Sequence, residues 1–323
     1  MKQFLKKTLA FGIALLLVAA VVQALITVRI KNKTTTGHDH LTIYPGEKFD
    51  ILFLGSSRCA DHFIPGVFKQ DVGLTSLNMG CIGHADIPSF LLKLNYYLLY
   101  HPAPRYVIMN FDLATINGPQ DPAQNRNYLA KHYFARYAFF AEPHNEMVSQ
   151  YFGFNLAERY LPMYAILKYK MLGDCITMKD GRNWMKKGYL EQGGVWNFDP
   201  VKQKDAVSRG HADTFRIRYA PIKDQMRYVK DLCAKNGSKL ICVHTPLFSM
   251  VYEDKGFELP GQMCRELDIP YIDMHRNTIP DSVVYFSDML HLNETGATRF
   301  CKALCADSTF RAALGGTART VAP

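Results

Sequence analysis

The first apolar feature of the chain is one long uncharged stretch. Residues 8–28 carry no formal charge and consist mostly of Ala, Leu, Val and Ile. A helix of this length measures about 30 Å, the thickness of the hydrocarbon core of a bilayer. A cleaved signal peptide is the alternative, but Val22-Gln23-Ala24 is a poor cleavage site and the stretch is long for a signal. The pattern favours an uncleaved N-terminal membrane anchor over residues 1–30.

Shorter apolar runs alternate with helical patterns further along the chain. Strands are predicted at residues 48–54, 75–79, 106–112, 240–244 and 271–274. Helices are predicted at residues 87–100, 221–236, 259–267 and 294–304. Nearly continuous apolar strands separated by helices are typical of a parallel sheet covered on both faces. The predicted fold class is therefore α/β, a three-layer α/β/α arrangement around a central, mostly parallel sheet.

Two segments interrupt this alternation. Residues 31–46 are polar and rich in Thr, which indicates a linker. Residues from about 118 to 215 are aromatic, basic and irregular, with a helical pattern at 156–172. Because a structureless loop of this length is uncommon in a compact domain, we expect a helical insertion, acting as a lid or a partner surface. The α/β domain then occupies residues 47–323, with the insertion inside it.

Charge changes the picture mainly through its location. The formal net charge is +9, but residues 1–37 hold six Lys or Arg and no acid, which leaves +3 for the remainder. The basic excess flanks the apolar stretch, where it suits a membrane surface. The domain itself carries too little positive charge to indicate binding of nucleic acid.

The eight cysteines are read as core residues. Most lie inside apolar runs, as Cys242 does, where cysteine behaves as a small apolar side chain. Cys301 and Cys305 are four residues apart on a predicted helix, where an intrahelical disulfide is unfavourable. Because no partner pair with metal-ligand spacing accompanies them, we expect no metal centre and no cofactor.

Two motifs could carry chemistry. Gly55-Ser56-Ser57 ends the first predicted strand, and ligands of open α/β sheets bind beyond the carboxyl ends of the strands. Asp288 precedes His291 by three residues, so its carboxylate can fix the imidazole tautomer and stabilise the protonated ring. Taken singly, each has a structural explanation. The serines could cap the following helix, and Ser287 or Asp288 could cap the last one.

Together, the two motifs resemble the SGNH (GDSL-type) hydrolase superfamily. The resemblance covers residues from about 48 to 120 and from about 220 to 307, and is strongest over residues 286–297. Gly-Ser-Ser in place of Gly-Asp-Ser resembles membrane-anchored branches similar to the teichoic acid D-alanyl transfer protein and the alginate O-acetylation proteins. The resemblance implies that Ser57 is the nucleophile, His291 the base and Asp288 the acid that orients it.

The same resemblance implies a set of oxyanion donors. Gly80, in Asn78-Met79-Gly80, matches the glycine whose backbone N–H would act together with that of Ser57. The asparagine block departs from the family pattern, because its glycine is missing and Asn110 is shifted by one residue. In a continuing strand Asn110 would point to the opposite face, and Asp112 could contact the site instead.

Further polar residues are expected near this edge of the sheet. Arg58 and His62 follow the serine turn, and His244 ends a later strand. Arg58, His62, Asp112 and His244 are the predicted substrate-binding residues, with Arg58 suited to an anionic group. A solvated arginine, or histidines that satisfy backbone carbonyls, are the alternatives.

The predicted function is serine-dependent acyl transfer or ester hydrolysis on a cell-surface polysaccharide or polymer. The anchor would hold the domain on the extracytoplasmic side of a cell membrane, beside a membrane-bound acyl donor or an integral membrane acyltransferase. The alternative is an inactive relative that serves in glycan binding or assembly, which the altered asparagine block favours.

Overall fold

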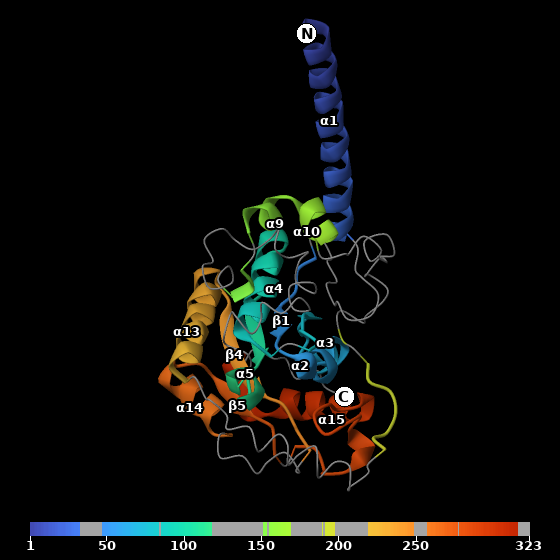
Figure 1. Ribbon diagram of the computed structural model, residues 1–323. Helices are drawn as coiled ribbons and strands as arrows, with labels where there is room; N and C mark the ends of the chain where they lie inside the picture. The colour runs from blue at the N-terminus through green and yellow to red at the C-terminus, as the bar shows by residue number, and fades with distance from the viewer. Residues whose placement is uncertain are drawn as a thin grey trace.

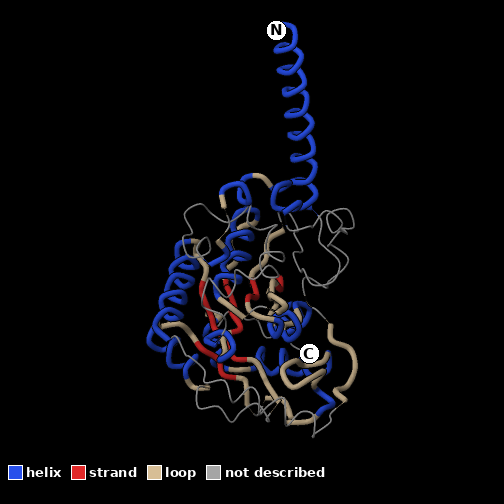
Figure 2. The backbone as a smooth tube through the Cα atoms, viewed as in Figure 1, coloured by secondary structure: helices blue, strands red, loops and turns tan. Residues whose placement is uncertain are grey.

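The structure is a computed structural model that describes residues 1–32, 47–83, 85–117, 151–153, 155–168, 189, 191–197, 219–248, 257–276 and 278–315. Helix α1 (Lys2–Asn32) projects from the rest of the described chain, whose helices surround one sheet (Figure 1 and Figure 2). Over Lys2–Leu25 it is long and apolar enough to cross a membrane, and none of its apolar window is buried. The predicted linker and most of the predicted insertion lie outside the described residues.

Five parallel strands form the sheet, in the order β2-β1-β3-β4-β5. They are β1 (Ile51–Leu54), β2 (Ser76–Asn78), β3 (Tyr106–Asn110), β4 (Lys239–His244) and β5 (Tyr271–Asp273). Each falls within a predicted strand or exceeds it by one residue, and every pairing is parallel. The prediction of an α/β fold with a mostly parallel sheet is confirmed.

Helices pack against both sets of strand side chains. The helices of the domain are α2 (Ser57–His62), α3 (Pro65–Asp71), α4 (Ile87–Tyr100), α5 (Leu113–Asn117), α13 (Tyr219–Lys235), α14 (Leu259–Glu266), α15 (Glu294–Ala306) and α16 (Ser308–Ala313). Leu52 and Leu54 of β1 share a core with α4, α13 and α14. Ile51 and Phe53 share a second core with α2, α3 and α15. Because neighbouring strand residues face opposite sides, this explains why the strands are apolar almost throughout.

The described helix ends follow from local capping. Asp86 accepts a hydrogen bond from the Ser89 N–H at 2.9 Å and begins α4, which has the predicted bounds. Asn293 caps α15 by accepting from the Gly296 N–H at 3.0 Å. The last helix is therefore capped by Asn293, and the alternative that Ser287 or Asp288 caps it is wrong.

The cysteines behave as predicted in the described part of the chain. The seven that it includes, all except Cys175, are buried free thiols. Both α15 cysteines belong to the core beneath α2 and α3. Cysteine therefore acts here as a small apolar residue.

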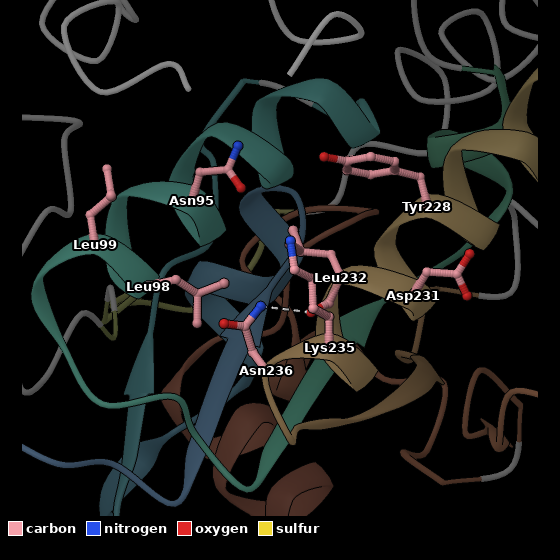
Figure 3. A pocket seen from close by; sticks show the side chains of 8 residues that line it. All are labelled: Asn95, Leu98, Leu99, Tyr228, Asp231, Leu232, Lys235 and Asn236. Carbon is pink, nitrogen blue, oxygen red and sulfur yellow. Dashed lines mark hydrogen bonds between the residues drawn. The ribbon is translucent and has the colours of Figure 1, made fainter. Parts of the chain in front are cut away.

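A cavity of about 340 Å³ lies between α4 and α13 (Figure 3). Its lining includes Leu98 and Leu99 of α4, and Tyr228 and Leu232 of α13. These residues belong to helices on one side of the sheet, so the cavity is separate from the carboxyl ends of the strands.

Candidate active site

The turn that follows β1 requires glycine. Gly55 has φ +148°, and a Cβ there would lie 2.7 Å from the Asn110 Cβ and 2.8 Å from the Cys59 Cβ. Ser56 follows as the N-cap of α2, its Oγ accepting from the Arg58 N–H at 3.3 Å. Ser57 is therefore the first residue of the helix and keeps its hydroxyl for another partner. Ser56 is therefore the helix cap, and Ser57 is the serine whose hydroxyl is available to the site. The sequence alone left these two roles undecided.

A hydrogen-bonded chain joins Ser57 to the far end of the sequence. The Ser57 Oγ lies 2.8 Å from the His291 Nε2. The Nδ1 of the same imidazole lies 2.9 Å from Oδ1 and 2.8 Å from Oδ2 of Asp288. The predicted hydroxyl, imidazole and carboxylate are thus in contact in the order that a Ser-His-Asp triad requires.

Asp288 also shapes the loop that presents His291. Its Oδ1 accepts from the N–H groups of Leu290 at 2.7 Å and of His291 at 2.9 Å. Partial burial acts to raise the pKa of Asp288, but the hydrogen bond and charge of His291, with these backbone donors, hold that pKa below its ordinary value. Asp288 is therefore ionised at neutral pH and accepts the His291 Nδ1 proton.

His62 stabilises the loop that carries Asp288 and His291. It is fully buried, and its Nε2 accepts from the Leu292 N–H at 3.0 Å. Burial, followed by the charges of His291 and Arg58, lowers its pKa well below the ordinary value. A buried imidazole that accepts a backbone hydrogen bond favours a structural role for His62, and its assignment as a substrate ligand stays a prediction.

Arg58 and Asp112 form a buried ion pair. The Arg58 Nη2 lies 2.6 Å from the Asp112 Oδ2, and the two side chains are 6% and 1% exposed. Neither charge can reach a ligand in solvent while they are paired. Each is the counter-ion of the other in this structure, and their assignment to substrate binding stays a prediction.

His244 is buried behind this pair. Its Nδ1 lies 3.0 Å from the Tyr271 hydroxyl. Burial lowers its pKa to about 3; among the neighbouring charges, Asp112 opposes this shift, whereas His275 and Arg58 add to it. His244 is consequently neutral and enclosed in this structure, and its assignment as a substrate ligand stays a prediction.

Beside His244 lies a group of the residue types that bind metals. Ligand atoms of His244, Asp273 and His275 lie within 4.8 Å of one another. The two imidazoles are stacked, with centroids 4.5 Å apart and planes at 16°. Imidazole lone pairs lie in the ring plane, so stacked rings cannot direct them to one cation. A shared metal would require one ring to turn.

The two predicted oxyanion donors are engaged elsewhere. The Gly80 N–H donates to the Asn78 Oδ1 at 3.0 Å, and a Cβ on Gly80 would lie 2.3 Å from the Ala60 nitrogen. The Asn110 Oδ1 accepts from the Ser56 hydroxyl at 3.2 Å, and its Nδ2 donates to the Thr245 Oγ1 at 3.2 Å. Gly80 allows close packing and Asn110 braces the serine turn in this structure, and their assignment as oxyanion donors stays a prediction.

Lys93 contacts Gly80 and is a residue that the sequence reasoning missed. It is fully buried on α4, and its Nζ donates to the Gly80 carbonyl at 2.7 Å. Cys81, the next residue, forms a parallel bridge with Ser56. Ile82 and Gly83 form the turn that follows Cys81, whose bridge partner Ser56 directly precedes Ser57. Lys93 thus holds the segment that enters this turn.

Asp61 is the second residue that sequence reasoning missed. It lies one helical turn after Ser57, and its Oδ2 is 4.0 Å from the His291 Nε2. Burial raises the pKa of Asp61 to about 7, and the charge of His291 and a 3.2 Å hydrogen bond from Gln192 oppose this rise. The available signal was the i, i+4 spacing, which places Ser57 and Asp61 on one helix face.

Gln192 belongs to a part of the insertion that crosses the histidine loop. Its carbonyl accepts from the Glu294 N–H at 3.1 Å, and the Gly194 carbonyl accepts from the Asn293 Nδ2 at 3.0 Å. The Trp196 N–H donates to the Phe286 carbonyl at 2.9 Å. This segment, residues 191–197, therefore holds the loop that carries Asp288 and His291.

Comparison with known proteins gives no family for the chain, since no protein-family model and no curated protein matches it. Functional inference therefore depends on the site itself.

Proposed function

We propose that this protein is a serine-dependent acyl-transfer enzyme of the SGNH type, whose sheet and helices form the three-layer α/β/α arrangement of that superfamily. The observation that carries this proposal is the contact of the Ser57 Oγ with the His291 Nε2 at 2.8 Å, with Asp288 on the other imidazole nitrogen. Two motifs 234 residues apart meet only through the fold. A pair of helix caps would not require that meeting.

Each triad residue has a defined task in the proposed reaction. Ser57 Oγ attacks an acyl carbonyl while its proton passes to the His291 Nε2, and Asp288 stabilises the resulting imidazolium. The Nε2 proton then passes to the leaving oxygen as the bond between acyl carbon and leaving group breaks. A second hydroxyl, from water or from an acceptor, attacks the acyl-enzyme while its proton passes to the His291 Nε2; the bond from the acyl carbon to the Ser57 Oγ then breaks, and the Ser57 Oγ takes back that proton. Water gives hydrolysis, and an acceptor hydroxyl gives transfer.

The oxyanion donors of the proposed reaction are backbone groups. The Ser57 N–H lies at the start of α2, where amides have no partner within the helix. The turn at Ile82 and Gly83 supplies the second donor in this proposal, because the Ser56–Cys81 bridge brings it beside Ser57. Loss of one such donor costs about 3–4 kcal/mol of transition-state stabilisation.

A carbohydrate or a similar polymer is the proposed acceptor. A hollow of about 590 Å³ beside the start of α15 is lined by hydroxyl-bearing and charged side chains, among them Tyr285, Thr298 and Arg299. Helices α2 and α15 lie in the half of the domain further from α1 (Figure 1). With α1 in a cell membrane and the domain on the extracytoplasmic side, the site would face the cell-envelope polymer, with an integral membrane acyltransferase as acyl source.

A second candidate function is a catalytically inactive module for glycan binding or assembly. The observation that favours it is the engagement of the Gly80 N–H and the Asn110 amide within the protein. In that case the hydroxyl and imidazole would be in contact without a complete oxyanion site.

A serine-reactive fluorophosphonate distinguishes these functions. We expect one adduct on Ser57 in the detergent-solubilised full chain, located by mass spectrometry, and none in Ser57→Ala or His291→Ala. Ser56→Ala is the matched control, because it removes the neighbouring hydroxyl and its helix cap yet leaves the triad. An adduct on another residue in Ser57→Ala would contradict the assignment. A folded wild type that never reacts would favour the inactive module.

A further inference from the structure

Exposed apolar side chains outside α1 are concentrated on two short helices. These are α9 (Leu156–Tyr160) and α10 (Pro162–Lys168). Of the nine large apolar side chains that the described residues beyond 32 expose, five belong to this stretch. They are Leu156 (70% exposed), Tyr160 (57%), Leu161 (50%), Tyr164 (41%) and Leu167 (55%), and we call them the α9–α10 face. Contiguous exposed apolar groups of this kind mark an interaction surface.

Glu158, the acid of α9, is turned inward. Glu158 is 1% exposed and forms a capping box with Asn155, whose N–H donates to Glu158 at 2.6 Å. The Lys168 Nζ reaches the other Glu158 oxygen at 2.7 Å. A surface helix in water normally shows the reverse pattern, with its charges outward and its leucines buried. The outer side of α9 and α10 is therefore made for an apolar environment.

Helix α1 shows which apolar environment this is. The Met163 N–H of α10 donates to the Gln23 Oε1 of α1 at 2.8 Å, and α10 contacts α1 directly. Figure 1 shows α9 and α10 at the foot of α1. Gln23 precedes the end of the uncharged stretch at Val28 by five residues, which is about 8 Å along a helix. Interfacial helices lie at about this depth, 5–10 Å into the boundary between headgroups and acyl chains.

We propose that the α9–α10 face lies in the interfacial layer of the membrane that α1 crosses. Its occupant is lipid, because α10 bonds to Gln23, which lies inside the uncharged stretch of α1 that would be in the membrane. Tyr160 and Tyr164 suit the headgroup level, where tyrosines are enriched, and Leu161 and Leu167 suit the acyl chains below. This second contact fixes the height and tilt of the domain, which a single helix would leave free to swing.

Tryptophan reporters in lipid nanodiscs test this proposal on the full-length protein. Leu161→Trp and Tyr164→Trp place the reporter on the face. Val284→Trp is the matched control, since Val284 is 51% exposed on η5 (Val283–Tyr285), beside the triad loop. Phe11→Trp reports on α1. The fluorescence of the added tryptophan is taken as the emission above that of the two native tryptophans. It is measured with one quencher on the lipid side, lipid brominated near the glycerol end of the acyl chains, and with one on the water side, acrylamide.

We expect brominated lipid to remove most of the added emission at positions 11, 161 and 164 and little at 284, with acrylamide showing the opposite order. Quenching at 11 but not at 161 or 164 would overturn the proposal, and protection of 161 and 164 from both quenchers would assign the face to a protein partner or a second copy. Absence of quenching by brominated lipid at position 11 as well would overturn both this proposal and the membrane span of α1. A reporter at Leu161, between α9 and α10, and a second at Tyr164 on α10 guard against one variant that misfolds.

Discussion

The buried ion pair between Arg58 and Asp112 supports a quantitative prediction, because the chain also contains an exposed pair of the same length. Arg227 and Asp224 on α13 are 2.6 Å apart, as Arg58 and Asp112 are, but their side chains are 51% and 70% exposed against 6% and 1%. Asp→Asn at either site keeps the side-chain shape and removes one charge. The two variants therefore compare one chemical change at two degrees of burial.

Asp112→Asn leaves the Arg58 guanidinium buried without its counter-ion. Breaking a buried pair in this way costs about 3–5 kcal/mol, which lowers Tm by roughly 6–20 °C in a domain of this size. Asp224→Asn should cost less than about 1 kcal/mol, because water screens an exposed pair. Thermal unfolding of the detergent-solubilised proteins, followed by circular dichroism, measures both. The double variant Arg58→Met with Asp112→Leu should recover much of the loss, since no unpaired charge remains.

Equal Tm values for Asp112→Asn and Asp224→Asn would refute this reasoning. They would restore the hypothesis that Arg58 is available to an anionic substrate, in which case substrate binding would weaken while stability stayed the same.

Further predictions concern pH, the glycine turn and the thiols. Burial raises the pKa of Asp86 to about 6, against 3.8 in the unfolded chain. The contribution of Asp86 to stability is therefore full below about pH 4 and is lost as the pH rises to about 6. Asp86→Asn, which keeps the helix cap, should flatten the pH dependence of Tm in that window. Because burial raises the pKa of Asp61 to about 7, Asp61→Asn should remove a titration near pH 7 from the pH profile of the fluorophosphonate reaction; an unchanged profile would make Asp61 merely structural. Gly55→Ala should cost more stability in urea unfolding than Gly73→Ala, where φ is also positive but the space for a Cβ is open. A thiol reagent should modify at most one of the eight cysteines in the native protein and all eight in denaturant, and rapid native modification of two or more would contradict the burial of the described seven.

Strands and helices were predictable because their signals are local. Apolar runs marked all five strands, and the helical pattern from Ile87 to Tyr100 matched both bounds of α4. The helical pattern at 156–172 was less accurate, since Pro162 begins a second helix and divides the described part into α9 and α10. Proline is favoured in the first turn and breaks the helix that precedes it.

Within the candidate site, the triad contacts were predictable and the surroundings were not. Ser57, Asp288 and His291 carry their signal in residue type and strand-end position. The counter-ion of Arg58, in contrast, lies 54 residues later, so its sequence neighbourhood cannot show that it is paired. The same is true of His62, which bonds to Leu292 across 230 residues. A polar side chain near a strand end can serve substrate or structure, and only long-range packing decides.

In the proposed reaction, the separation of Ser57 from His291 also determines when Ser57 can become reactive. The serine is made early and the imidazole 234 residues later, on a loop that α15 and residues 191–197 hold in place. At the usual rates of synthesis, about 5–20 residues per second, roughly 10–50 s separate the two. Throughout that interval Ser57 has no base and is an ordinary hydroxyl. In that reaction, a nascent chain cannot react through Ser57 until its final helices have folded. A truncated product that lacks these helices cannot react in this way at all.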